Sequence, residues 1–74
     1  MDKLRIDKWL WAARFYKTRA LAAKAVSGGH VHVEGVRVKP SREIKVGDMV
    51  EVKKSPYVFK VTVLDLSAQR GSAR

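Results

Sequence analysis

The first third of the chain places its apolar residues at the spacing of amphipathic α-helices. Between positions 6 and 15 they recur every three or four residues, which puts them on one face and predicts a helix there. This stripe consists of Ile6, Trp9, Leu10 and Ala13. Asp7 suits the first turn of the helix, where the macrodipole favours a negative charge. Trp11 and Phe15 lie outside the stripe; they could stack on an unpaired base, but packing inside the domain is the interpretation we favour.

A second helix is predicted from position 18 to about position 27. Thr18 is a suitable N-cap, because its hydroxyl oxygen can accept a hydrogen bond from a backbone N–H of the first turn. The pair Gly28-Gly29 ends the pattern, since glycine adopts the left-handed conformation after a helix without a Cβ clash. The apolar arc comprises Leu21, Ala22, Ala25 and Val26. A short connection around Tyr16-Lys17 would join the two helices.

After Gly29 the apolar period changes from about 3.6 to 2, which is typical of strands. Glu34-Gly35 is a turn signal between two short alternating runs and predicts a β-hairpin. Pro40 interrupts the alternation, because proline cannot donate to a strand ladder. The strands are predicted at 30–33, 36–38, 44–46, 49–52 and 57–66. The expected fold class is therefore α+β, with two N-terminal helices packed on a small, mainly antiparallel sheet.

The chain length and composition indicate one small domain with a basic surface. Seventy-four residues form at most one domain with a thin core, which we place at residues 1–66, and residues 67–74 read as a disordered or truncated C-terminal tail. Sixteen Lys and Arg oppose seven Asp and Glu, giving a formal net charge of +9. Residues 1–30 hold seven of these bases against two acids. Such a domain favours polyanions, although charge alone does not distinguish RNA, DNA and an anionic membrane surface.

Several classes of protein are disfavoured by what the sequence lacks. It has no cysteine, and no apolar run approaches the roughly 20 residues that span a bilayer. The N-terminal residues show no secretory signal, and the helices offer too little contiguous apolar surface for interfacial anchoring. We therefore expect a cytoplasmic protein without a membrane partner.

The sequence also offers little for catalysis. His30 and His32 share a face of one predicted strand, and Glu34 would fall on the same side, but Glu34 sits at the predicted turn and an isolated pair of histidines two residues apart is a weak metal signal. No serine stands in a known nucleophile context, no paired carboxylates stand out, and Gly28-Gly29 is better explained as a helix stop than as a phosphate loop. We expect no enzyme activity, no cofactor, no bound metal and no small-molecule substrate.

The basic residues of the first half are more informative. Lys17 and Arg19 flank Thr18 at the start of the second helix, where free backbone N–H groups and the helix dipole favour an anion. Cations at positions the apolar stripes leave free can converge on this connection if the helices pack at an angle. The hypothesis from charge and periodicity is a phosphate-binding surface centred on Thr18.

Several motifs support a more specific assignment. The first is the run from Arg5 to Arg19, RIDKWLWAARFYKTR, and the others are Gly28-Gly29-His30-Val31, Val33-Glu34-Gly35, Val38-Lys39-Pro40-Ser41 and Val46-Gly47-Asp48. Over roughly residues 4–53 they resemble the RNA-binding domain first described in ribosomal small-subunit protein S4, which carries the alpha-L motif. Within that superfamily, the first run resembles the bacterial ribosome-associated heat-shock proteins of the fifteen-kilodalton class.

The resemblance implies an alpha-L fold in which the helical pair and a following loop hold RNA. The implied RNA contacts are Arg5, Lys8, Arg14, Lys17, Thr18, Arg19, Lys24, Lys39 and Ser41. It also implies ribosomal RNA as the ligand and, as partner, a large ribosomal subunit that carries a stalled nascent chain on tRNA. Members of this class usually continue into a basic helical extension that this sequence lacks, which leaves the contribution of that extension open.

Two other functions stay open at this stage. The same domain serves as the RNA-targeting module of pseudouridine synthases and methyltransferases, so the chain could be a piece of an rRNA-modifying enzyme. It could also be a general nucleic-acid binder, since contacts to phosphates are common to RNA and DNA.

Overall fold

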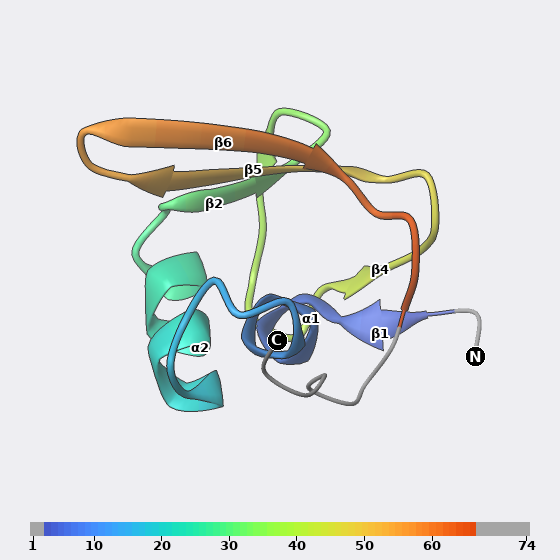
Figure 1. The fold of residues 1–74 in the computed structure, drawn as a ribbon, viewed down its shortest axis with the longest axis horizontal. Coiled ribbons are helices and arrows are strands. Elements are labelled where there is room, and N and C mark those ends of the chain that lie inside the picture. Colours follow the sequence, from blue (N-terminus) through green and yellow to red (C-terminus); the bar gives the residue numbers. More distant parts are fainter. Residues whose placement is uncertain (1–2, 67–74) are drawn as a thin grey trace.

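The computed structural model describes residues 3–66 and shows two helices beneath a sheet (Figure 1). The predicted tail at 67–74 lies outside the described residues. In chain order the elements are β1 (Leu4–Arg5), α1 (Ile6–Ala12), α2 (Arg19–Ser27), β2 (Val31–Val33), β3 (Val36–Arg37), β4 (Glu43–Ile44), β5 (Met49–Lys54) and β6 (Tyr57–Thr62). The predicted α+β class with two N-terminal helices and antiparallel strands is confirmed.

Helix α1 ends earlier than the sequence predicts. It stops at Ala12, and the predicted stripe member Ala13 is exposed. Arg14 takes a left-handed conformation, with φ 67°, and the Phe15 N–H donates to the Leu10 carbonyl at 3.0 Å. This is the hydrogen-bonding pattern of a helix C-terminus that reverses through one left-handed residue. The sequence did not predict this helix end, because arginine occupies the left-handed position at which glycine or asparagine is usual.

Helix α2 begins and ends where the sequence predicts. The Thr18 hydroxyl accepts a hydrogen bond from the Leu21 N–H at 3.1 Å, which confirms the N-cap. After the helix Gly29 takes φ 80°, as expected for the residue that reverses the chain. Ala22 and Val26 are buried, but Leu21 is 47% exposed, so its predicted place in the apolar arc is wrong.

The strands form one four-stranded antiparallel sheet and one two-stranded pair. In the larger sheet the order is β3-β2-β5-β6, and the predicted hairpin turn at Glu34-Gly35 is confirmed, with φ 52° and 80°. Strand β6 ends at Thr62, four residues before the predicted end. The smaller pair joins β1 to β4 and was not predicted; its second strand covers residues 43–44 instead of 44–46.

The core lies between the two helices and the inner face of the large sheet (Figure 1). Alternate residues of β5 point inward, so Val50 and Val52 are buried while Met49 and Lys53 are exposed. Burying one large apolar side chain stabilises the fold by about 1.5–3 kcal/mol. The largest fully buried side chains are Ile6, Leu10, Val26, Val31, Val33, Ile44, Val50, Val52 and Val63. Within residues 3–66, neither helix has the length and apolar character needed to cross a membrane.

Candidate nucleic-acid interface

The connection between α1 and α2, residues 13–18, carries the centre of the predicted RNA surface. Arg14 and Lys17 lie in this connection and are exposed, and Arg19 follows as the first residue of α2. Thr18 uses its hydroxyl oxygen as the helix cap, which leaves its O–H free to donate to an anion. The connection thus presents cations, a hydroxyl donor and the N-terminal N–H groups of α2 along one short stretch.

A buried carboxylate holds two of the predicted arginines together. Asp7, in the first turn of α1, is 3% exposed. Its Oδ2 accepts a hydrogen bond from Arg5 Nη2 at 2.9 Å, and its Oδ1 lies 3.6 Å from Arg19 Nε, an ion-pair distance without a hydrogen bond. The start of α1 and the start of α2 are therefore joined. About half of each arginine side chain stays exposed, so both guanidinium groups remain available to a ligand.

The loop before β4 joins this region through the backbone. The Ile6 N–H donates to the Arg42 carbonyl at 2.8 Å, and the Arg42 N–H donates to the Lys39 carbonyl at 2.9 Å. The loop that contains Lys39 and Ser41 is therefore tied to the first residue of α1, next to Arg5. Both residues are exposed. Lys8, one turn further along α1, is half-buried.

Lys24 lies on a different side of α2 from Arg19. It follows Arg19 by five residues on α2, which at 3.6 residues per turn puts it roughly 140° away around the helix axis. It lines a hollow of about 370 Å³ together with Tyr16, Leu21 and His30. We therefore give the name basic face to Arg5, Lys8, Arg14, Lys17, Thr18, Arg19, Lys39 and Ser41, and treat Lys24 separately.

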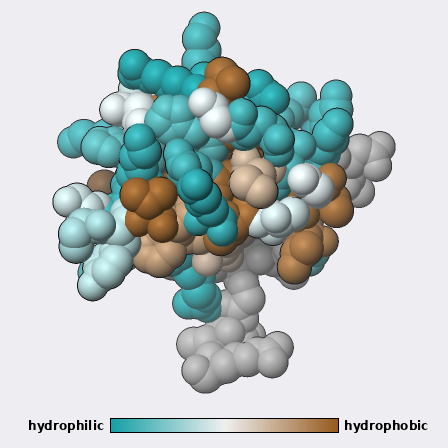
Figure 2. Space-filling view, turned by 90° about the horizontal axis from the view of Figure 1, so that it is seen from above, coloured by the Kyte–Doolittle hydropathy of each residue, from teal (hydrophilic) through white to brown (hydrophobic). Residues whose placement is uncertain are grey.

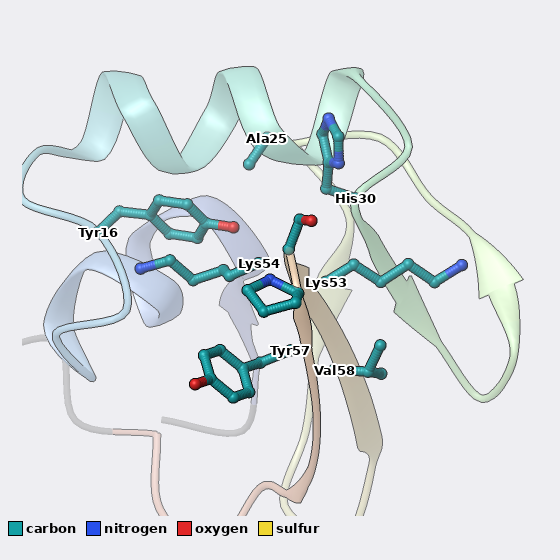
Figure 3. A pocket seen from close by; sticks show the side chains of 9 residues that line it. Tyr16, Ala25, His30, Lys53, Lys54, Tyr57 and Val58 are labelled. Carbon is teal, nitrogen blue, oxygen red and sulfur yellow. The ribbon is translucent and has the colours of Figure 1, made fainter.

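The structure also shows a groove that sequence reasoning missed. It has a volume of about 700 Å³ and lies between the α1–α2 connection, α2 and the turn of the β5–β6 hairpin (Figure 3). Lys54 Nζ donates to the Phe15 carbonyl at 2.8 Å and sits 5.0 Å from the centre of the Tyr16 ring. Burial raises the pKa of the Tyr16 hydroxyl above its usual value of 10.0. No local motif predicts this groove, because it depends on contacts between residues about forty positions apart.

Of the two aromatic residues outside the predicted stripe, Phe15 packs as expected. It lies against the core, with its ring 6.1 Å from Trp9 and 6.1 Å from Phe59. Trp11 is half-buried on the last turn of α1. The stacking interpretation is therefore wrong for Phe15.

His30, His32 and Glu34, which the sequence offered as a weak metal signal, lie in three different environments. Glu34 accepts a hydrogen bond from the Met49 N–H at 2.7 Å, which fixes its carboxylate to the start of β5. His30 precedes β2 and lines the groove, whereas His32 pairs with Glu51 inside the sheet. Within the described part of the chain, no three His, Cys, Asp or Glu side chains gather to hold a metal ion.

Comparison with known proteins gives one family and several relatives. The S4 domain family matches residues 4–50. The heat shock protein 15 homolog of Aeromonas salmonicida is 48% identical over 71 residues, which cover 96% of this chain and 54% of that protein. The RQC P-site tRNA stabilizing factor of Streptococcus pneumoniae is 33% identical over 63 residues, covering 85% of this chain and 72% of that protein.

A solved structure agrees with these sequence relatives. Trimeric Vibrio cholerae heat shock protein 15 superposes with a TM-score of 0.90 at 42% identity, over 96% of this chain and 72% of that one. The chain itself spans about half the length of the Aeromonas protein. The likeness therefore extends over nearly all of this chain, in both fold and sequence.

Proposed function

The chain belongs to the S4 domain family, and from that premise we propose that it binds structured ribosomal RNA through the basic face. The observation that carries the proposal is the cluster in which Asp7 joins Arg5 and Arg19 beside the exposed cations of the α1–α2 connection. Cations grouped around a helix N-terminus suit phosphate oxygens, which supply most contacts in complexes with nucleic acids. A half-exposed arginine held by a carboxylate is also already oriented for its ligand.

We further propose that the physiological target is a large ribosomal subunit that carries a stalled nascent chain on tRNA, in the cytoplasm. Two observations support this finer assignment. One relative is named as a P-site tRNA stabilizing factor, and the relatives that match nearly the whole chain are heat shock proteins of the class whose first motif this sequence shares. Enzymes that use the domain as an RNA-targeting module share the fold, but the similarity to heat shock protein 15 extends through residues 51–66 as well.

Cosedimentation with purified ribosomal subunits tests the assignment. We expect binding to be tightest for large subunits that carry peptidyl-tRNA, weaker for empty large subunits and weakest for small subunits. The double variant Arg14→Asn, Lys17→Gln should weaken binding by about tenfold or more, because hydrogen bonds to charged groups contribute roughly 1.5–3 kcal/mol each. Asparagine is chosen at position 14 because it tolerates the positive φ found there.

The matched control removes two cations from elsewhere on the surface. Lys45→Gln with Lys60→Gln also lowers the formal net charge from +9 to +7, but both lysines are outside the basic face. If the control weakens binding as much as the double variant, the affinity comes from overall charge and the proposed face is wrong. Equal binding to both subunits would contradict the proposed target, and equal affinity for duplex DNA in competition would reduce the function to general polyanion binding.

A further inference from the structure

The β5–β6 hairpin extends beyond the rest of the sheet and leaves aromatic surface uncovered. Strand β2 pairs with β5 only as far as Val52, so the residues from Lys54 to Tyr57 have no strand beside them except each other. Tyr57 is 66% exposed. Tyr57 is on the inner face of the sheet, because it is two residues from Phe59 and four from Val61 along β6 and pairs opposite Lys54. It lies beyond the part of this face that the helices cover. Phe59 beside it is 41% exposed, so the two rings form a contiguous exposed aromatic surface, and such apolar surface can mark a binding site.

Tyr57 is held in place by a chain of rings that starts in the core. Trp9 contacts Phe15, Phe15 meets Phe59 edge to face, and Phe59 lies 6.2 Å from Tyr57. Trp9 is itself fixed by a hydrogen bond from its indole N–H to the Asp65 carbonyl at 3.2 Å. The exposed ring is thus the outermost member of an ordered aromatic cluster. A ligand that stacks on it does not have to order a loose side chain first.

The lining of the groove favours a ligand that combines a flat apolar part with a negative charge. Tyr16 and Tyr57 project to the same side of the hairpin with the Lys54 side chain between them, whereas Lys53 and Val58 point to the other side (Figure 3). Lys54 donates one of its three N–H groups to Phe15, so it retains donors for an anion. Among the described residues that line the groove there is no carboxylate.

A second hollow of similar size shows why charge matters here. Its volume is about 720 Å³, and its lining alternates basic residues with the carboxylates Glu34, Glu43 and Asp48. Those carboxylates repel phosphate, and two of them already accept hydrogen bonds from backbone N–H groups. Of these two hollows, the groove beside Tyr57 is the one whose charge suits a nucleotide.

The groove adjoins the α1–α2 connection, which carries part of the basic face. Tyr16 stands between Arg14 and Lys17 in the α1–α2 connection, and Lys54 is hydrogen-bonded to the neighbouring Phe15 carbonyl. Figure 2, seen from above, looks onto the outer face of the sheet, where hydrophilic side chains surround several apolar ones; the groove lies on the inner side. An RNA strand that leaves the basic face at the connection meets the groove next.

We propose that the groove between Tyr16, Lys54 and Tyr57 binds one unpaired nucleotide of the RNA, with the base stacked on Tyr57 and the adjacent phosphate on Lys54. The inference rests on the proposed RNA-binding function and adds to it a preference for RNA with unpaired bases. Stacking on an aromatic side chain tolerates any base, because every base has a flat π-face. The site therefore selects single-stranded structure, not sequence, while the basic face supplies the phosphate contacts.

The test measures affinity for two labelled RNAs by fluorescence anisotropy: a hairpin with an unpaired loop, and a fully paired duplex of the same length. Tyr57→Ala should weaken binding to the looped RNA by about 5- to 100-fold and leave duplex binding unchanged, given the usual loss on removing a stacking ring. Tyr57→Phe should retain wild-type affinity for both. Val36→Ala, which trims an exposed side chain on the opposite edge strand of the sheet, should change neither.

Several outcomes would overturn the proposal. Unchanged affinity of Tyr57→Ala for the looped RNA would remove the nucleotide site, and an equal loss on both RNAs would show a general effect instead of stacking. A variant that binds RNA normally but changes its mass in sedimentation would identify the groove as a contact between copies of the chain. If the wild-type protein binds neither RNA, both the proposed RNA-binding function and the nucleotide site are wrong. If Arg14→Asn, Lys17→Gln loses affinity but Tyr57→Ala does not, only the nucleotide site is wrong.

Discussion

At the scale of single residues, Asp7 both belongs to the folded core of α1 and positions two arginines of the proposed RNA surface. A carboxylate that is 3% exposed is costly unless its charge is compensated. Here Arg5 donates a hydrogen bond to Oδ2 and Arg19 lies at ion-pair distance from Oδ1, and both arginines belong to the proposed RNA surface. The sequence predicted Asp7 as a favourable first-turn residue, which is correct, but not as the link between Arg5 and Arg19. That link depends on how the two helices pack, and the spacing of residues along the chain does not determine it.

Replacing this carboxylate should destabilise the fold. We expect Asp7→Ala to lower the free energy of unfolding by about 1–3 kcal/mol, because it removes a charge-assisted hydrogen bond at a nearly buried site while both partners stay half-exposed. Urea denaturation measures the change. Glu43→Gln, at an exposed carboxylate, is the control and should stay within about 0.5 kcal/mol of wild type. A loss no larger than the control would show that Asp7 does not organise the two arginines.

The α1–α2 connection is the element that the sequence predicted least well. The apolar stripe suggested a helix as far as position 15, but Arg14 turns left-handed and ends it at Ala12. Glycine would have marked this position, and arginine does not. By contrast, α2 begins after Thr18 and ends before Gly29, as predicted. The Thr18 hydroxyl itself caps the helix, and Gly29 has no Cβ to clash in the left-handed conformation. Local signals were reliable where the residue type itself determines the conformation.

Non-local elements escaped sequence reasoning for a different reason. The pair formed by β1 and β4 joins residues about forty positions apart through strands of two residues each, too short to show an alternating pattern. The β5–β6 hairpin was predicted as strands, but its reach beyond β2 depends on the register between three strands. The groove beside Tyr57 follows from that register and could not be read from any motif.

The β2–β3 turn gives a direct test at the scale of elements. Gly35 has φ 80°, and a Cβ added there would meet no atom within 4 Å, so any effect of substitution comes from the backbone. Gly35→Ala should lower the free energy of unfolding by about 1–2 kcal/mol, the cost of the left-handed conformation in an ordinary residue. Gly35→Asn should lose less, because asparagine tolerates that conformation. Thermal or urea unfolding compares them, and equal losses would contradict this account of the turn.

At the scale of the whole molecule, the proposed RNA-binding surface consists of the basic face and the groove. The sequence predicted that these cations lie on the surface, because they fall outside the apolar stripes, and apart from the half-buried Lys8 they are exposed. It could not say which of them are neighbours. The structure groups Arg5 with Arg19, ties the Lys39–Ser41 loop to the start of α1, and places Lys24 at a hollow that shares Tyr16 and His30 with the groove. The grouping, rather than the count of charges, is what distinguishes a binding face from a generally basic surface.

The salt dependence of RNA affinity tests that grouping most directly. Each phosphate contact that is lost should reduce the slope of log affinity against log salt concentration by about 0.7–0.9. Titrations at several salt concentrations should therefore give a slope for Arg14→Asn, Lys17→Gln that is shallower than wild type by roughly 1.5. The Lys45→Gln, Lys60→Gln control should keep the wild-type slope. The same slope for all three proteins, or an equal decrease in both variants, would contradict the proposal that the residues around Thr18 form the RNA-binding face.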